Sequence, residues 1–147
     1  MLADKAKIAG LIPHAGNMCL LDGVLACDAQ RISCVSNTHL DQGNPLRTAN
    51  GLPALCGIEY AAQAMAVHGG MTGGTGSKPR AGYLAGVRDV VFAAPRLDTL
   101  KTSLTIDAER LMGDEASAMY QFSLSAGGAV VLQGRATVVL DADKAAA

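Results

Sequence analysis

Residues 53–70 have the sequence PALCGIEYAAQAMAVHGG, and this stretch decides the fold. Pro53 is typical of a first helical residue, and the two glycines at the end are typical of a helix stop. Almost every side chain between them is small or apolar, so the helix lacks the polar stripe of a surface helix and we expect neighbours on all sides. Glu59 and Gln63 are exceptions, and their spacing of four places them on one face.

Glu59 is the first candidate functional residue. A carboxyl group is costly to bury unless it is hydrogen-bonded or protonated, and a carboxyl with a raised pKa in an apolar setting is a common acid-base group in enzymes. The alternative is a structural Glu that bonds main-chain groups at a dimer interface. We expect the functional role, because charged residues inside an apolar helix are rare.

The composition predicts one domain over residues 1–147, with a leader at 1–10 and a frayed tail at 141–147. Twelve basic and thirteen acidic residues give no overall charge that favours nucleic acid or a membrane surface. No apolar run reaches the roughly 18 residues of a membrane span, so we expect a cytoplasmic protein. The four cysteines show no C-x-x-C spacing, which argues against a metal site and favours reduced, packed thiols.

The rest of the chain is expected to form strands. Two precede the helix, in residues 18–26 and 32–38, with a turn at 27–30. About four antiparallel strands follow it, within residues 84–92, 100–107, 120–124 and 130–140, and Gly127 and Gly128 mark a hairpin turn. Strands on both sides of a single apolar helix predict an α+β fold in which a curved antiparallel sheet wraps the helix. One side of the helix stays uncovered, so we expect a dimer.

Three segments resemble the hot-dog-fold 3-hydroxyacyl-acyl-carrier-protein dehydratases. Ile12-Pro13-His14 with Leu20, Leu21, Asp22 and Val24 is similar to the L-P-H…L-x-D-x-V segment of that family. Leu52-Pro53 with Glu59 and Gln63 is similar to its helix signature, and Val90-Val91-Phe92…Pro95…Asp98-Thr99-Leu100 to a later strand and turn. The sequence GIEYAAQAMAVHGG resembles that of a dehydratase-like branch associated with pigment and polyene biosynthesis.

The resemblance implies a hot-dog fold and loss of water from a 3-hydroxyacyl thioester. The substrate is then carried on the phosphopantetheine arm of an acyl carrier protein, or on coenzyme A, with no other cofactor and no metal. Glu59 is then the acid that protonates the leaving hydroxyl, and Gln63 fixes the orientation of the Glu59 carboxyl group or of a water molecule. Free N–H groups in the first turn after Pro53, around Ala54, Leu55 and Cys56, polarise the thioester carbonyl.

The second catalytic group of that family is missing from its place. The family has a histidine fourteen residues before the helix carboxylate, and this chain has Pro45 there. His39 is the alternative catalytic base, with a solvated strand-end histidine as the competing interpretation. His14 is a further candidate near the substrate, although we favour a structural role for it. His68 is expected to complement the negative end of the helix.

Three functions stay open from the sequence. The first is a carrier-dependent dehydratase, and the second is a non-catalytic partner subunit of an active dehydratase, because Pro45 replaces the histidine. The third is an acyl thioesterase, in which Glu59 activates water. The expected partners are an acyl carrier protein and either a second copy or a related dehydratase. Four basic residues are candidates for contacting the carrier: Lys78, Arg80, Arg88 and Arg96.

Overall fold

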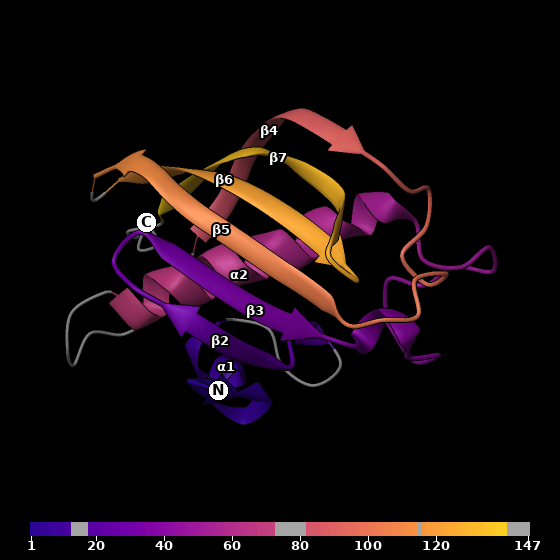
Figure 1. The fold of residues 1–147 in the computed structure, drawn as a ribbon. Helices are drawn as coiled ribbons and strands as arrows, with labels where there is room; N and C mark the ends of the chain where they lie inside the picture. The colour runs from indigo at the N-terminus through magenta and orange to yellow at the C-terminus, as the bar shows by residue number, and fades with distance from the viewer. Residues whose placement is uncertain (13–17, 73–81, 115, 141–147) are drawn as a thin grey trace.

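The computed structural model describes residues 1–12, 18–72, 82–114 and 116–140. Seven strands in these ranges form one antiparallel sheet in the order β1-β2-β3-β5-β6-β7-β4 (Figure 1). The strands are β1 (Ala3–Asp4), β2 (Gly23–Cys27), β3 (Arg31–Ser36), β4 (Gly82–Phe92), β5 (Leu104–Gly113), β6 (Ser117–Ala126) and β7 (Ala129–Leu140). The helices are α1 (Lys5–Leu11), α2 (Gly57–Thr72) and the 3-10 turns η2 (Thr38–Leu40) and η3 (Ala54–Cys56).

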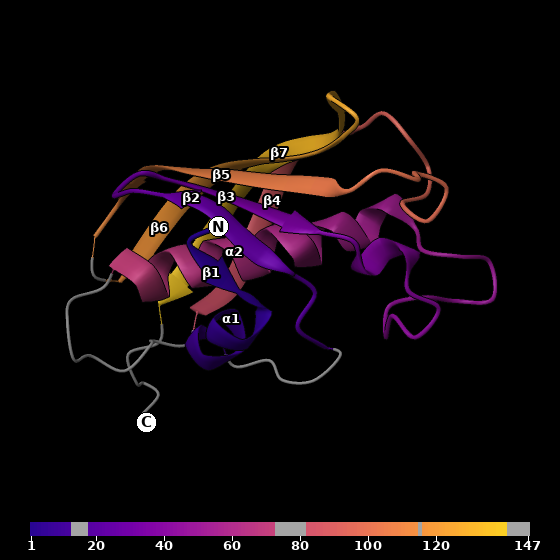
Figure 2. The ribbon, with the colours of Figure 1, turned by 60° about the horizontal axis from the view of Figure 1, so that its bottom comes forward.

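The long helix α2 lies against one face of the sheet and packs mainly on β3, β5 and β6 (Figure 2). Strand alternation builds the core between these layers. In β3 the buried residues Ile32 and Cys34 alternate with more exposed ones, and β5 and β6 repeat the pattern. The expected α+β fold, with one long helix wrapped by an antiparallel sheet, is confirmed.

The two ends of α2 differ from the sequence-based boundaries. Pro53 is extended, with ψ 148°, and the chain makes the turn η3 before α2 begins at Gly57. Tertiary contacts explain the delay, because Pro53 pairs with Arg96 in a β-bridge and Ala54 N donates to Pro95 O at 2.9 Å. The expected glycine stop is also wrong, since α2 continues through both glycines to Thr72.

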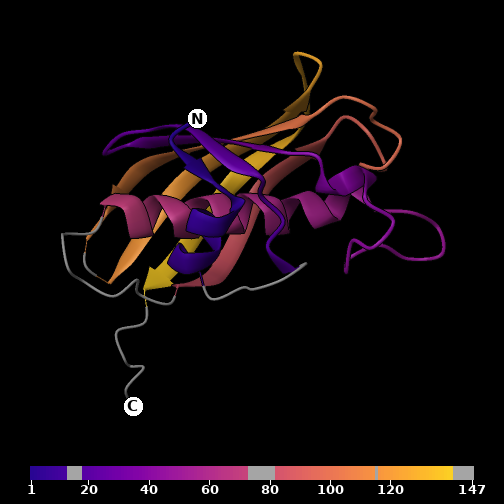
Figure 3. The same cartoon turned by 90° about the horizontal axis from the view of Figure 1, so that it is seen from below.

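The N-terminal segment is folded, contrary to the predicted leader. Asp4 caps α1 by accepting a bond from Lys7 N at 3.0 Å, and Ile8 is completely buried. Strand β1 pairs with β2, and α1 contacts α2 on the side away from the sheet (Figures 2 and 3). Residues 1–12 therefore cover part of the central helix. The predicted tail at 141–147 lies outside the described residues.

Strand β4 forms one edge of the sheet, next to β7. Its register sets three apolar residues of β4 opposite core-side residues of β7, so all three face the α2 side. These residues are Leu84, Val87 and Phe92, and they are 38–43% exposed. An open edge strand with exposed apolar side chains on its inner face is a typical surface for another chain.

Candidate active site

Glu59 and Gln63 lie one turn apart on α2 but in different surroundings. Gln63 is buried, and its Oε1 accepts a bond from Leu20 N at 2.8 Å while its Nε2 donates to Met18 O at 2.7 Å. Glu59 is half-buried, and no hydrogen bond or ion pair holds its carboxylate within the described part of the chain. Gln63 therefore fixes the segment before β2, whereas Glu59 stays available to a ligand or a partner.

The first turn before α2 offers fewer free N–H groups than the sequence predicted. Ala54 N donates to Pro95 O, Cys56 N donates to Pro53 O, and Gly57 N caps η3. The predictions for Ala54 and Cys56 as free donors are thus wrong, because loop contacts use both groups. Leu55 N has no acceptor among the described residues, and the Leu55 side chain is 63% exposed. This N–H group lies one turn before Glu59.

His39 is buried rather than exposed at a strand end. Its Nε2 lies 2.8 Å from Leu100 O, and because a carbonyl only accepts, Nε2 carries the proton. Nδ1 is buried and has no hydrogen-bond partner among the described residues. Burial lowers the pKa of His39. No hydrogen bond or ion pair connects His39 to Glu59 in the described ranges.

The loop at the position of the missing histidine is fixed by Asn44. This side chain is 5% exposed, and its Nδ2 donates to Thr38 O at 2.8 Å and to the Tyr60 hydroxyl at 3.0 Å. Its Oδ1 accepts a bond from Leu46 N at 2.9 Å. All polar atoms of the amide are therefore used inside the chain. At the position where the family resemblance predicts an imidazole, the loop has Pro45, and the hydrogen-bonding atoms of the neighbouring Asn44 amide are already in use.

Tyr60 connects this loop to the rest of the site. Its hydroxyl lies 2.8 Å from Thr38 Oγ1, and burial raises the pKa of Tyr60. Thr38 Oγ1 and Ser36 Oγ both donate to Leu20 O. Since Gln63 holds Leu20 N, both polar main-chain groups of Leu20 are bonded to side chains. A continuous hydrogen-bond network thus holds the surroundings of α2 in one arrangement.

Beside Glu59, α2 has a stripe that the described residues cover only in part. Ile58, Ala62 and Ala66 are half-buried at spacings of four, while the residues on the opposite face are buried. The stripe and the three apolar residues of β4 thus keep part of their surface exposed among the described residues.

His68 makes polar contacts that differ from those expected from the sequence. It is buried, its Nε2 donates to Asp28 O at 2.9 Å, and its Nδ1 lies 2.7 Å from the Tyr120 hydroxyl. The two rings meet edge to face with centroids 5.5 Å apart. Burial lowers the pKa of His68. The expected complement to the helix end is wrong, because α2 extends a turn further and the neutral imidazole joins α2 to β6 and the β2–β3 turn.

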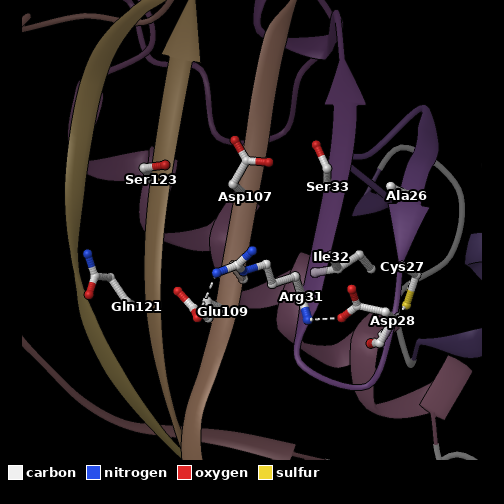
Figure 4. Close-up of a pocket in the computed structure, with 11 residues that line it drawn as sticks. Ala26, Cys27, Asp28, Arg31, Ile32, Ser33, Asp107, Glu109, Gln121 and Ser123 are labelled. Carbon is white, nitrogen blue, oxygen red and sulfur yellow. Dashed lines mark hydrogen bonds and ion pairs between the residues drawn. The ribbon is translucent and has the colours of Figure 1, made fainter.

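A groove of about 370 Å³ lies on the outer face of the sheet, away from α2 and Glu59 (Figure 4). Asp107 occupies its floor, and Arg31 forms an ion pair with Glu109 at 3.2 Å along one wall. Both ionic side chains are well exposed, so the pair contributes little to stability. The described residues contain no group of three or more possible metal ligands, and none of their helices is long and apolar enough to span a membrane.

The outcome for the predicted site is mixed. Glu59 and Leu55 N lie together at the start of α2 with polar groups available, and Pro53 leads into that turn as an exposed residue. Gln63 and His39 are committed to main-chain bonds, and His14 lies outside the described residues. Sequence reasoning missed the partners of Asp98, although the residue stood in a family-like segment. The sequence feature that could have indicated these partners is the position of the Asp98 carboxylate two residues after Arg96.

Comparisons with known proteins identify the family and the fold. Residues 6–147 match the model of the ApeP-like family, described as ApeP dehydratase. The chain is similar to a structure of the dehydratase heterocomplex ApeI:P from Xenorhabdus doucetiae, with 26% identity, 90% of each chain covered and a TM-score of 0.81. No protein with a curated description matches.

Two thioesterases share the fold alone. A mutant of thioesterase PA1618 from Pseudomonas aeruginosa is 12% identical, with 95% of each chain covered and a TM-score of 0.68. Thioesterase HI1161 from Haemophilus influenzae is 11% identical over 80% of this chain and 76% of the other, with a TM-score of 0.59. The chain therefore has the hot-dog fold, with a half-buried carboxylate on its central helix. Within that fold class, the chain belongs to the ApeP-like dehydratase family.

Proposed function

We propose that this chain is one subunit of a heteromeric dehydratase that removes water from a carrier-bound 3-hydroxyacyl thioester. The observation that carries the proposal is Glu59, a half-buried carboxylate on α2 that has no hydrogen bond or ion pair among the residues that the structure describes. Membership of the ApeP-like dehydratase family supports the reaction class. The heterocomplex named for the Xenorhabdus doucetiae relative supports the assembly.

The reaction requires two proton transfers and one polarised carbonyl. A base takes the proton α to the thioester carbonyl, the bond between the β-carbon and the hydroxyl oxygen breaks, and the carbon–carbon double bond forms. Glu59, in its acid form, gives its proton to the departing hydroxyl, so that water leaves. Leu55 N–H donates to the thioester oxygen as negative charge develops there. These steps need no metal and no diffusible cofactor.

The base in this proposal comes from the partner subunit. Within this chain, His39 donates Nε2–H to Leu100 O, and the Asn44 loop takes the place of the family histidine. An imidazole that the partner brings close to Glu59 then completes one active site. The reciprocal site, which would need an imidazole from the Asn44 loop, is inactive. A heterodimer built in this way has one working site.

The partner is expected to bind across β4 and α2. A strand added to the β4 edge satisfies its main-chain groups, and a helix laid on the half-buried stripe covers Ile58, Ala62 and Ala66. Aromatic and aliphatic side chains of β4 supply apolar area for this contact. The same placement encloses Glu59, which excludes water from the reaction.

The substrate arm belongs to an acyl carrier protein in this proposal, or to coenzyme A. Both carry the phosphopantetheine group and both reach a cytoplasmic enzyme. Arg88 is exposed and can meet an acidic carrier or the phosphate, whereas the Arg96 guanidinium is bonded to Asp98. The other two basic candidates, Lys78 and Arg80, lie outside the described residues.

The test uses purified chain, alone and together with the related dehydratase subunit of the same organism. Each sample receives a 3-hydroxyacyl acyl carrier protein, and intact-protein mass spectrometry follows loss of one water. We expect turnover by the complex and none by the isolated chain. Turnover by the chain alone at the rate of the complex contradicts the heteromeric assignment. Release of free acid in place of the enoyl product identifies a thioesterase.

A further inference from the structure

Asp98 is a buried carboxylate that lies between two arginines. It is 7% exposed, and Arg96 contacts it with two nitrogens, Nε at 3.1 Å from Oδ1 and Nη2 at 2.5 Å from Oδ2. Arg47 Nη1 approaches Oδ2 at 3.6 Å. The Arg96 guanidinium and the Leu52 N–H hold the pKa of Asp98 well below its usual range. The carboxylate is therefore charged at neutral pH. These three side chains are called the Asp98 clamp below.

The Asp98 clamp holds the chain segment that leads into α2. Asp98 Oδ1 accepts a bond from Leu52 N at 2.9 Å, and Leu97 N donates to Leu52 O at 2.8 Å. Ala54 N then donates to Pro95 O, so three hydrogen bonds tie residues 52–54 to residues 95–98. The two loops lie side by side at the N-terminal end of α2 (Figures 1 and 3). Leu55 follows directly, and its N–H is the donor left free.

Gly51 shows how closely the clamp meets the backbone. A Cβ atom on Gly51 would lie 2.5 Å from Arg96 Nη2 and 2.6 Å from Asp98 Oδ2. The φ of Gly51 is +102°, a conformation that favours glycine. The turn at 48–51 is thus shaped to let the charged groups approach the main chain.

Arg47 extends the clamp to the loop that replaces the family histidine. Its Nε donates to Asp41 O at 3.3 Å and its Nη2 to His39 O at 3.4 Å. One guanidinium therefore connects residues 39–41 with Asp98. Both loops that border the candidate site, one on each side of the start of α2, are fixed through a single carboxylate.

We propose that Asp98 is a positioning residue for the dehydration, acting through the main chain to aim Leu55 N–H at the thioester oxygen. The inference rests on the proposed function, because it needs a substrate carbonyl at the start of α2. Asp98 itself does not touch the substrate. Charged hydrogen bonds are stronger and more directional than neutral ones, which suits a group that must fix a donor to within a fraction of an ångström.

A purely structural role for Asp98 makes a different prediction. Loss of a structural carboxylate lowers stability while the rate per folded complex is unchanged. Loss of a positioning carboxylate lowers kcat, because a misaimed donor fails in the transition state, and leaves KM for the substrate nearly unchanged. A misplacement of about 1 Å is able to reduce the rate about a hundredfold. The two roles can therefore be distinguished by kcat and by how strongly the thioester carbonyl of a bound ligand is polarised.

The experiment uses the reconstituted heterocomplex with Asp98→Asn, which keeps an acceptor for Leu52 N but removes the charge. Arg96→Gln is the second variant, since Arg96 is half-exposed and its loss is tolerated more easily by the fold. We expect kcat to fall about ten- to a hundredfold in both, with KM within about threefold. Arg31→Gln, which breaks an exposed ion pair on the outer face, is the matched control and should keep the wild-type rate.

Infrared spectroscopy gives the second readout. A saturated acyl thioester without the 3-hydroxyl, labelled with ¹³C at the carbonyl, binds without reacting. In the wild-type complex its carbonyl stretch should lie below the value in solution, because Leu55 N–H polarises it, and in Asp98→Asn it should return towards that value.

Wild-type kcat and carbonyl stretch in both variants overturn the positioning role. The proposed function stands in that case, provided that Glu59→Gln abolishes turnover. If Glu59→Gln leaves turnover intact, the proposed function itself fails.

Discussion

Glu59 and Gln63 are separated by one turn of α2, yet only Gln63 is bonded within the chain. Its amide bonds Met18 O and Leu20 N, whereas the Glu59 carboxylate has no such bond among the described residues. The pair that the sequence joined as one catalytic unit therefore divides into two roles. Gln63 acts in folding, and Glu59 is the group available for chemistry.

Gln63→Met tests this division. The change leaves Leu20 N, which is buried, and Met18 O, which is partly buried, without their side-chain partners. An unsatisfied buried group costs about 1–3 kcal/mol, so we expect the free energy of unfolding to fall by about 1–3 kcal/mol. Glu59→Gln is the matched control and should change the free energy of unfolding by less than about 0.5 kcal/mol. Urea titration monitored by circular dichroism measures both. Equal effects at the two positions would contradict the assignment.

Two glycines of α2 are expected to respond to alanine in opposite directions. A Cβ atom on Gly57 would clash with Leu132 Cδ2 and lie 3.1 Å from Leu124 Cδ2, inside the core. Gly57→Ala should therefore lower stability by about 1–3 kcal/mol through overpacking. Gly69 has no atom within 4 Å of such a Cβ, and Gly69→Ala should raise stability by up to about 1 kcal/mol. Thermal unfolding of the two variants beside the wild type measures the difference in sign.

The buried imidazole of His68 predicts a loss of stability in mild acid. Burial lowers its pKa in the folded state below the value of about 6.5 in the unfolded chain, so the unfolded chain binds more protons. Its contribution is complete above pH 6.5 and is lost as the pH falls through the folded-state pKa. His39 shifts in the same direction.

The measurement for His68 is the free energy of unfolding between pH 5 and pH 8. His68→Gln should be less stable than the wild type at pH 8 and should show a smaller decline towards pH 5. His39→Gln, which removes the other buried imidazole, should also reduce the decline. A wild-type slope that survives in both variants would mean that other groups cause the acid sensitivity.

Strand β4 is expected to carry the contact with the partner subunit. Val87→Glu places a charge on its inner face, where apolar area is expected to be buried, and should weaken the complex at least about tenfold. Met112→Glu is the control, because Met112 is an exposed apolar residue of β5 at 64% exposure. Isothermal titration calorimetry with the purified partner gives both affinities. Unchanged affinity for Val87→Glu places the interface elsewhere.

Local pattern was enough to predict the α+β architecture and the central helix, and it singled out Glu59 as the candidate for chemistry. Apolar alternation marks the strands, and a carboxylate in an alanine-rich helix is conspicuous without any structure. The boundaries failed where distant contacts decide them. Pro53 is held extended by its bridge to Arg96, so α2 begins later than its composition suggests.

The misplaced residues of the site have the same cause. His68 looks like a helix-end charge until β6 brings Tyr120 and the β2–β3 turn brings Asp28 O to its ring. Asp98 gains its role from Arg47 and Leu52, which lie about fifty positions away in the sequence. Such partners become visible only when the loops are folded together.

The most direct test of the central claim is single-turnover dehydration by the heterocomplex with Glu59→Gln in this chain. The amide keeps the shape of the side chain but has no proton to give, so we predict a rate at least about a hundredfold below wild type, with the complex and its affinity for the substrate intact. A Glu59→Gln complex that removes water at the wild-type rate would contradict the claim that this chain supplies the acid.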